Sequence, residues 1–265
     1  MEYVRGDVMD NYEKFVSDLK QYLNIDLAGY KRQQMERRTN ALMGTLGYKG
    51  NYNEFVRVMR TDKEIFNRFL NHMTINVSEF FRNPQQWEKL EKNILPSLLS
   101  ESANLKIWSA GCSTGEEPYT LAMILAESFG FGKHTILATD FDNSVVAKAS
   151  EGVYLKKEVQ GTPEKYLHKY FDVQDDKYKV KDELKKNITF KNHNLLRDDF
   201  PVALDLIICR NVVIYFKEDA KSILYYNFHK ALRRGGILFT GSTEQILQAR
   251  SIGYSTADTF FYKKN

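Results

Sequence analysis

A turn of small residues between two glycines is the first place in this sequence where residue types suggest chemistry. Residues 107–123 read IWSAGCSTGEEPYTLAM, with Gly111 and Gly115 flanking the turn. Small residues between a strand and a helix let the backbone approach a ligand, and the helix N-terminus offers N–H donors. Glu116 and Glu117 open the helix, and their carboxylates would repel the phosphates of a dinucleotide. The pattern favours a cationic or amine-bearing ligand without phosphate; its simpler interpretation is an ordinary strand-to-helix turn.

Two aspartates follow the next apolar run. Residues 134–140 read HTILATD and end in Asp140, with Asp142 close behind. In nucleotide-binding folds an acid at the end of the second strand binds ribose, because a carboxylate accepts both hydroxyl protons. We expect Asp140 to bind ribose, although Asp142 could take that role and either acid could instead cap the next helix. Adenosylmethionine, a sulfonium without phosphate, would suit both patterns.

Two further stretches place polar and aromatic residues where a ligand would bind. Residues 205–216 read DLIICRNVVIYF, so Arg210, Asn211 and Tyr215 follow a buried strand. Ligands of open α/β sheets bind at the carboxyl ends of the strands, which predicts that these three residues rim the site. Residues 76–84, NVSEFFRNP, join two parts of the chain, and such junctions often hold sites. A plain loop and a packed linker are the alternatives for these two stretches.

The elements that position these residues alternate from about residue 84 onward. We expect strands at 105–111, 134–140, 204–210 and 236–241, and helices at 85–99, 116–129, 144–149 and 218–232. This alternation is typical of βαβ units and a parallel sheet. Residues 254–262 read as one or two antiparallel edge strands. We predict an α/β domain over residues 84–265, with a small, partly β subdomain inserted at 152–190.

The residues before this domain carry helical periodicity without β-alternation. Apolar residues recur at helical spacing in several runs, and Asp62 is a plausible N-cap of the last run. Residues 31–60 hold seven basic and two acidic residues, a larger excess than the net +4 of the whole chain. We predict an all-helical domain and linker over residues 1–83. Its basic run would attract an acidic partner, or would simply be a solvated face.

Composition narrows the class of protein. The 265 residues are 43% hydrophobic and 27% charged, as in globular proteins with a sizeable core. A pI of about 8.8 is mild for a nucleic-acid-binding domain. Two isolated cysteines, no long apolar run and a polar N-terminus predict a cytoplasmic protein without a membrane span. We expect this protein to be a monomer. Five scattered histidines lack ligand spacing, so we expect no metal.

Taken together, these stretches resemble the chemotaxis-receptor methyltransferases of the CheR type. The motifs, in the expected order, are TINVSEFFRN, IWSAGCSTGEEPYTLAM, ILATDFD, NHNLL, IICRNVVIYF and GGILFTGSTE. The resemblance implies an α/β fold: a Rossmann-like methyltransferase domain dependent on S-adenosylmethionine (SAM), an N-terminal all-helical domain and a small inserted β subdomain. It implies methylation of glutamate side chains on the cytoplasmic helical domains of chemotaxis receptors, with S-adenosylhomocysteine as product, for sensory adaptation.

The resemblance also assigns residues. It implies that the cofactor contacts are Asn76, Ser78, Arg82, Glu117, Asp140, Asn194, Leu195, Arg210 and Asn211. Arg82 and Tyr215 are implied to line the methyl-transfer site. Basic residues of the helical domain are implied to meet the receptor, here Lys31, Arg32, Arg37, Arg38, Arg57 and Arg60. The inserted subdomain has only a short, glycine-free connection at 173–178, which argues against tethering of a receptor C-terminal pentapeptide there.

The expected reaction needs no general base, because a glutamate side chain with a pKa near 4.3 is already ionised at neutral pH. The absence of a convincing His–Asp or Cys–His pairing agrees with this. Competing interpretations are a nucleic-acid methyltransferase, a small-molecule methyltransferase and a non-enzymatic adaptor that binds SAM. Against the first, Arg210-Asn211-Val212-Val213 stands where amino-methylating enzymes carry a Pro-Pro box.

Overall fold

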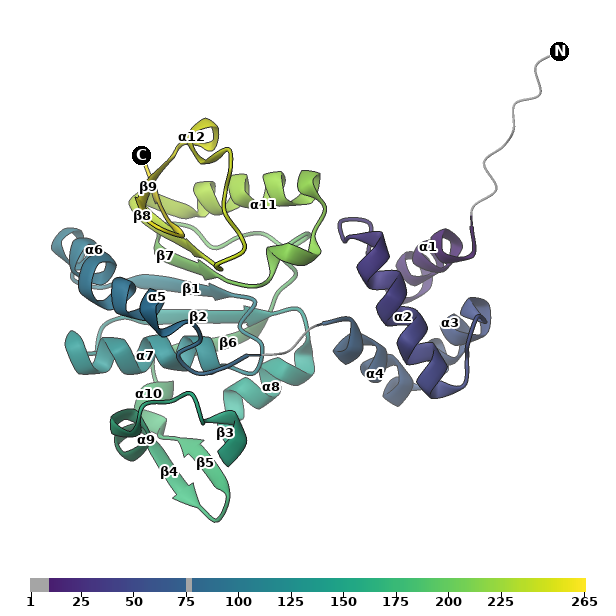
Figure 1. Cartoon of the computed structure of the whole chain (residues 1–265), viewed down its shortest axis with the longest axis horizontal. Helices are drawn as coiled ribbons and strands as arrows, with labels where there is room; N and C mark the ends of the chain where they lie inside the picture. The colour runs from purple at the N-terminus through teal and green to yellow at the C-terminus, as the bar shows by residue number, and fades with distance from the viewer. Residues whose placement is uncertain (1–9, 75–77) are drawn as a thin grey trace. The chain divides into compact units, whose positions relative to one another are not determined.

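The computed structural model describes residues 10–74 and 78–265, which form two compact units (Figure 1). The first unit holds the helices α1 (Asn11–Leu23), α2 (Arg32–Leu46), α3 (Tyr52–Thr61) and α4 (Lys63–Met73), together with the segment Tyr215–Ala220. The remainder of the described chain forms the second unit, an α/β structure of Rossmann-like class. No helix within the described ranges is both long and apolar enough to cross a bilayer.

The helical unit has its own core. Phe15, Phe55 and Phe69 are fully buried and pack ring against ring, with centroids 5.9–6.4 Å apart. The prediction that Asp62 caps a helix is confirmed: its Oδ1 accepts hydrogen bonds from the second and third N–H groups of α4, at 2.8 and 3.1 Å. Such a cap satisfies donors that the helix itself leaves unpaired.

The segment Tyr215–Ala220 is fastened to this helical unit. The Lys31 N–H donates to the Tyr215 carbonyl at 2.9 Å, and the Lys217 N–H donates to the Gly29 carbonyl at 2.8 Å. The rings of Tyr30 and Phe216 meet edge to face with centroids 4.9 Å apart. A residue expected at the rim of the α/β site, Tyr215, therefore belongs to the helical unit.

A seven-stranded sheet forms the centre of the second unit. Its order is β6 (Ile188–Asn192), β2 (Thr135–Asp140), β1 (Lys106–Ala110), β7 (Leu204–Cys209), β8 (Leu232–Thr240), β10 (Phe261–Lys264) and β9 (Tyr254–Asp258). The first five strands are parallel, and β10 is antiparallel to both of its neighbours. From β1 the chain adds β2 and then β6 on one side, and it then crosses to the other side of β1 to add β7 and β8. This creates a topological switch point at the carboxyl ends of β1 and β7.

Successive side chains of each strand point to opposite faces of this sheet, and both faces are covered by helices. Ile107 and Ile208 share one core with residues of α5 (Pro84–Lys89), the π-helical turn η1 (Leu90–Ile94), α6 (Leu95–Glu101) and α7 (Glu116–Ser128). On the opposite face, Trp108 packs edge to face on Phe228 of α11 (Glu218–Ala231), with centroids 5.6 Å apart. The strand β1 is thus covered on both sides, which explains why all four residues from Ile107 to Ala110 are buried.

A smaller sheet follows α8 (Asn143–Glu151) and occupies the inserted stretch. It contains β3 (Val153–Leu155), β5 (Lys177–Val180) and β4 (Phe171–Gln174), in that order, with η2 (Lys156–Glu158), α9 (Glu164–Tyr170) and α10 (Asp182–Lys185) around it. Figure 1 shows β3, β4, β5 and α9 gathered at the end of the unit below α10. Tyr154 and Phe171 of this part join the main hydrophobic core.

Two strands differ from the sequence-based expectation. Ile188–Asn192 forms β6 of the large sheet, whereas the sequence pattern indicates no strand at these residues and places 152–190 in the insertion. The strand β8 begins at Leu232 rather than at residue 236. Its early start has a physical cause, because Arg233 is held there by Asp205 at 2.6 Å and by Glu101 at 2.7 Å.

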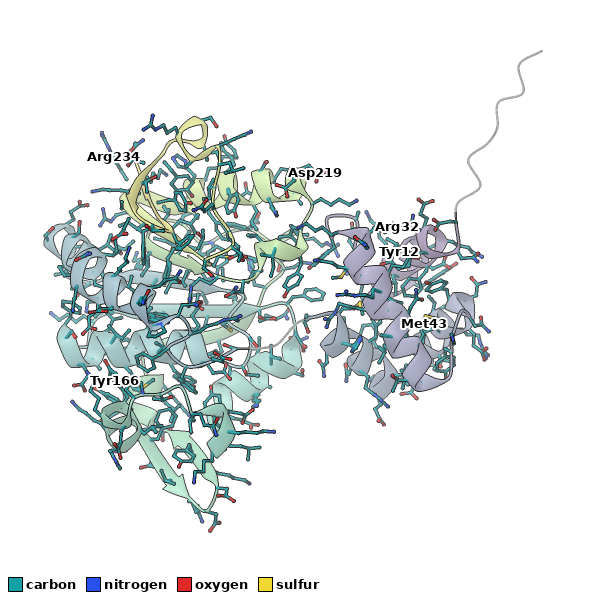
Figure 2. The ribbon with its side chains drawn as sticks, viewed as in Figure 1. Tyr12, Arg32, Met43, Tyr166, Asp219 and Arg234 are labelled. Atoms are coloured by element: carbon teal, nitrogen blue, oxygen red, sulfur yellow. The ribbon has the colours of Figure 1, made fainter. Side chains whose placement is uncertain are left out.

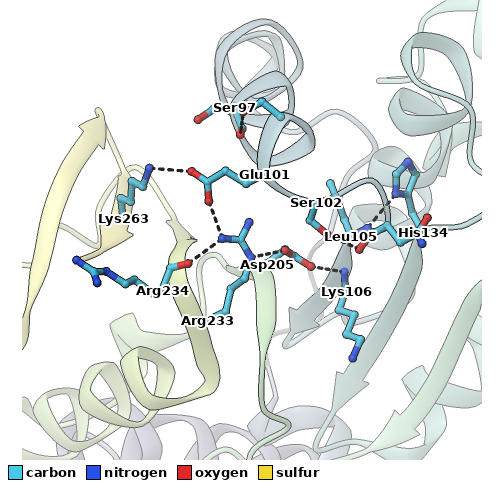
Figure 3. A network of polar contacts seen from close by, with 12 residues as sticks. Ser97, Glu101, Ser102, Leu105, Lys106, His134, Asp205, Arg233, Arg234 and Lys263 are labelled. Atoms are coloured by element: carbon cyan, nitrogen blue, oxygen red, sulfur yellow. Dashed lines mark hydrogen bonds and ion pairs between the residues drawn. The ribbon is translucent and has the colours of Figure 1, made fainter.

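That arginine belongs to a polar network at the amino ends of the strands (Figure 3). Asp205 also accepts the Lys106 N–H at 2.7 Å, and Lys263 lies 3.3 Å from Glu101. The network ties β1, β7, β8, β10 and α6 together at the edge opposite the candidate site. We interpret it as a structural device that fixes strand register.

Candidate functional site

The glycine turn between β1 and α7 is constrained by packing. Gly111 has φ +91°, and a Cβ there would lie 2.4 Å from the Val212 side chain. Gly115 has φ +97°, and a Cβ there would lie 3.0 Å from both Ala149 and the Tyr154 hydroxyl. The close approach of these protein groups, together with the positive φ angles, therefore requires glycine at both positions.

A carboxylate occupies the start of α7. The Thr114 hydroxyl lies 2.7 and 2.8 Å from the two oxygens of Glu116, which is 2% exposed. Ser78, a predicted cofactor contact, also hydrogen-bonds to Glu116, and burial raises the pKa of this carboxyl. Because a helix N-terminus is the usual place for a bound phosphate, a carboxylate there disfavours phosphate ligands.

Glu117 and Arg210 form a buried ion pair beside this turn. The Arg210 Nη1 lies 3.6 Å from Glu117 Oε2, and the two side chains are 3% and 12% exposed. The Ser109 hydroxyl donates to Glu117 Oε1 at 2.9 Å. Burial raises the pKa of Glu117 and lowers that of Arg210, while each opposite charge works against these shifts. The structure therefore brings together two of the predicted cofactor contacts.

Arg210 also anchors the stretch that carries Arg82. Its Nη2 lies 2.9 Å from the Arg82 carbonyl, 3.0 Å from Asn83 Oδ1 and 2.9 Å from Gln86 Oε1. Its guanidinium packs over the rings of Trp87 and Phe239, at 5.3 and 4.9 Å from their centroids. The backbone of Arg82 is thus fixed from within the protein core.

Positive φ angles on both sides shape this stretch further. Phe81 has φ +53° and Asn83 has φ +58°, in a region that non-glycine residues seldom adopt. The Phe81 N–H donates to the Thr120 hydroxyl at 3.1 Å, which fixes the turn to α7. Sharply turned backbone held by core contacts is typical of functional sites. Asn76, another predicted cofactor contact, lies outside the described residues.

The two aspartates after β2 have separate roles. Asp140 accepts the Ser113 N–H at 2.9 Å and the Asp142 N–H at 3.1 Å, and burial raises its pKa. Asp142 caps α8 and accepts the Ser144 N–H at 2.8 Å and the Ser144 hydroxyl at 2.7 Å. This geometry favours Asp140, which bonds to the glycine turn, for binding a ribose.

Ser113 is a candidate that the sequence analysis did not single out. Its hydroxyl is buried without a hydrogen-bond partner among the described residues, and its φ is +48°. An orphaned hydroxyl within the turn fits a ligand that supplies the missing partner. The one sequence feature that could have identified Ser113 is its position between Gly111 and Gly115.

The remaining predicted cofactor contacts lie at neighbouring strand ends. After β6, the Asn194 N–H donates to Asp198 at 2.8 Å and its Oδ1 accepts the Leu196 N–H at 3.0 Å, which forms a turn holding the half-buried Leu195. After β7, Asn211 adopts φ +60°, a conformation that asparagine tolerates better than most residues. The ends of β2, β6 and β7 thus each carry a predicted contact.

The basic residues predicted to meet a receptor differ in their surroundings. Arg32 is paired with Asp10, Glu13 and Glu36 and lies 5.4 Å from the Tyr12 ring. Figure 2 labels both residues on the helical unit. Arg38 is half-buried and donates to the carbonyls of His72 and Thr74.

The other four have fewer side-chain contacts with the rest of the helical unit. Arg57 lies 3.6 Å from Glu54, and Arg60 sits 4.6 Å from the exposed Tyr22 ring. Arg37 is exposed and forms no ion pair within the described part of the chain, and Lys31 is half-buried at the N-cap of α2. The surface charge available to a partner is therefore smaller than the residue count suggested.

Exchanging each of the two aspartates for asparagine should separate their roles. Asp140→Asn is expected to weaken S-adenosylhomocysteine binding about tenfold, because the amide turns a donor toward N–H groups and loses an acceptor. Asp142→Asn should bind with nearly wild-type affinity, since asparagine is an equally good helix cap. Titration calorimetry of the purified variants measures both. Equal losses in the two variants would contradict the assignment.

The local chemistry fits SAM. The carboxylates of Glu116, Glu117 and Asp140 lie around the turn. Glu116 occupies the N-terminus of α7, where a phosphate would otherwise bind. A sulfonium and an ammonium would add positive charge beside these buried carboxylates. When bound, SAM provides an electrophilic methyl group.

Comparisons with known proteins agree with this chemistry. The family described as "CheR methyltransferase, SAM binding domain" matches residues 76–259, and "CheR methyltransferase, all-alpha domain" matches residues 10–74. The chain is 40% identical to a chemotaxis protein methyltransferase of Listeria monocytogenes, over 97% of this chain and 98% of that protein. It is 35% identical to one of Borreliella burgdorferi, over 97% and 94% of the two chains, and 30% identical to one of Escherichia coli, over 84% and 80%. The chain therefore belongs to the CheR methyltransferase family, and its α/β unit is a SAM-dependent methyltransferase domain.

Proposed function

We propose that this protein transfers a methyl group from SAM to glutamate side chains of chemotaxis receptors in the cytoplasm, for sensory adaptation. The observation that carries the proposal is the carboxylate-lined turn at the carboxyl edge of the sheet, with Glu116, Glu117 and Asp140 around it. Such a site selects a cationic methyl donor over a phosphate-bearing cofactor. The names of the related proteins support chemotaxis as the setting.

The proposed reaction is a direct displacement. A receptor glutamate oxygen forms a bond to the methyl carbon as the carbon–sulfur bond breaks, which yields a glutamate methyl ester and S-adenosylhomocysteine. The nucleophile is ionised at neutral pH, so no protein base has to remove a proton. The protein's part is to position the reactants and to exclude water.

We assign the predicted residues to this reaction as follows. Arg82, on the backbone turn fixed by Arg210, holds the substrate carboxylate or the cofactor. Tyr215 orients either of them through its hydroxyl. Asn76, Ser78, Glu117, Asp140, Asn194, Leu195, Arg210 and Asn211 contact the cofactor. The proposal rests on the match of these residues to the family motifs and on the geometry described above.

We assign receptor recognition to the helical domain, expected over residues 1–83, with the methyltransferase domain over 84–265. Receptor methylation helices are acidic because glutamates are the substrate, so basic residues on the helical domain would steer them in. Arg32 has three acidic partners and Arg38 is half-buried against backbone carbonyls, so Lys31, Arg37, Arg57 and Arg60 are the better candidates. Of these four, Arg57 lies 3.6 Å from one acid, Glu54.

Reversing the charge of Arg37 should therefore weaken receptor recognition. Arg37→Glu is expected to lower kcat/KM for receptor about threefold to tenfold at low salt, through KM, with a smaller effect at high salt. Arg234→Glu makes the same charge change at an exposed position of the second unit and should leave kcat/KM unchanged. Steady-state kinetics at several ionic strengths measures this. A salt-independent loss, or an equal loss in both variants, would exclude steering by Arg37.

Transfer of labelled methyl to isolated chemoreceptor cytoplasmic fragments tests the function itself. The label should appear on the receptor and be released by mild base, as a carboxyl methyl ester requires. Parallel reactions with DNA, RNA and small carboxylic acids test the alternative substrates. Label on one of those and none on the receptor would overturn the proposal.

A further inference from the structure

The loop that follows β7 is held by a carboxylate from another part of the sequence. Glu244 comes four residues after the end of β8 and is 4% exposed. Its Oε2 accepts the Asn211 N–H at 2.7 Å, and its Oε1 accepts the Ile214 N–H at 3.3 Å. The Glu244 carboxylate thus accepts hydrogen bonds from backbone N–H groups at both ends of the loop 211–214.

The same carboxylate closes its own loop. Glu244 Oε2 also accepts the Gly241 N–H at 2.9 Å. A Cβ at Gly241 would lie 2.5 Å from Glu244 Oε2 and 2.9 Å from the Asn211 nitrogen, so glycine is required for this close approach. The segment 241–244, GSTE, is therefore built to place a carboxylate behind Asn211. A carboxylate bound by several backbone N–H groups is a strong and directional anchor.

The position of this anchor relates it to the cofactor contacts. Asn211 follows Arg210 directly and has a φ of +60°. Its backbone N–H, which donates to Glu244, fixes the residue in this conformation. The charge of Glu244 also acts on Arg210 and on Glu117, so it lies close to their buried ion pair. Asn211 and Arg210 are proposed cofactor contacts, and the chain leads from Ile214 directly into Tyr215.

We propose that Glu244 is a positioning residue for methyl transfer, which sets Arg210 and Asn211 in place by binding the backbone of the loop 211–214. This inference rests on the proposed function for its kinetic part. It gives a role to the GSTE segment, which the cofactor and receptor assignments leave without one. Glu244 acts through the loop and need not touch the substrate or the cofactor.

The test compares Glu244→Gln with two further variants. Glu244→Gln keeps the shape but turns an amide donor toward backbone N–H groups. We expect it to weaken S-adenosylhomocysteine binding about tenfold and to lower kcat by a similar factor, because small misplacements of contact residues have large effects on rate. Gly241→Ala keeps the charge and displaces the carboxylate, so it should show the same pattern. Gln245→Ala changes an exposed neighbour and should behave as wild type.

The readouts separate positioning from folding. Binding is measured by calorimetry and kcat at saturating substrates, at a temperature where thermal unfolding shows each variant to be fully folded. If Glu244→Gln does not fold, Gly241→Ala carries the same test. Wild-type affinity and kcat in a folded variant with only a lower Tm would overturn the proposal. The binding arm needs no receptor, so it stands even if receptor methylation by the wild type fails.

Discussion

Replacing Arg210 with methionine is expected to lower the free energy of unfolding by about 3–5 kcal/mol, because a buried carboxylate loses its cation. Arg210 is 6% exposed, and its guanidinium lies beside Glu117 and three further acceptors. Methionine fills a similar volume but offers no donor to any of them. Chemical denaturation followed by circular dichroism measures the change, and SAM binding should be lost as well.

A second substitution distinguishes the ion pair from simple packing. Arg210→Met combined with Glu117→Gln removes the uncompensated charge and should recover part of the lost stability without restoring SAM binding. If the double variant is as unstable as the sum of the two single variants, the pair is not coupled. If Arg210→Met alone is as stable as wild type, the buried charge is not balanced by Arg210.

Replacing Arg82 with alanine is expected to lower kcat by about a hundredfold, because the substrate carboxylate or the cofactor loses the side chain that orients it for the displacement. The backbone carbonyl of Arg82, which accepts from Arg210, stays in place, so stability should change little. The affinity for S-adenosylhomocysteine should fall by less than kcat. Single-turnover methylation of receptor fragments measures the chemical step directly.

Two companion variants sharpen this result. Arg82→Lys keeps the charge but loses the planar, two-pronged donor, so it should recover only part of the rate. Tyr215→Phe removes a single hydroxyl and should lower kcat with little loss of cofactor affinity. A wild-type rate in Arg82→Ala would remove this arginine from the mechanism, and unchanged turnover in Tyr215→Phe would do the same for the tyrosine.

The strands that carry the site could be predicted because their signals are local. Apolar runs that end in a glycine, an acid or an arginine located β1, β2 and β7 closely, and the helix cap at Asp62 follows from residue type and position. The strand β6 was missed because only Ile188 and Phe190 are apolar in it. One of its residues is buried, as suits a strand at the edge of the sheet.

The partners of polar side chains could not be predicted, because they come from distant parts of the chain. Asp140 and Asp142 are equivalent in the sequence, and only the N–H groups around them separate a turn contact from a helix cap. The anchor at Glu244 joins residues about thirty positions apart. A count of basic residues likewise does not show that Arg32 is already paired.

The raised pKa values of Glu116, Glu117 and Asp140 have a consequence for catalysis in acid conditions. As the pH falls through these values the carboxyls take up protons and lose their attraction for a sulfonium. The methyl donor carries that positive sulfur and its thioether product does not. Acidification should thus lower the affinity for SAM more than the affinity for S-adenosylhomocysteine. Inhibition by this product should therefore increase as the pH falls.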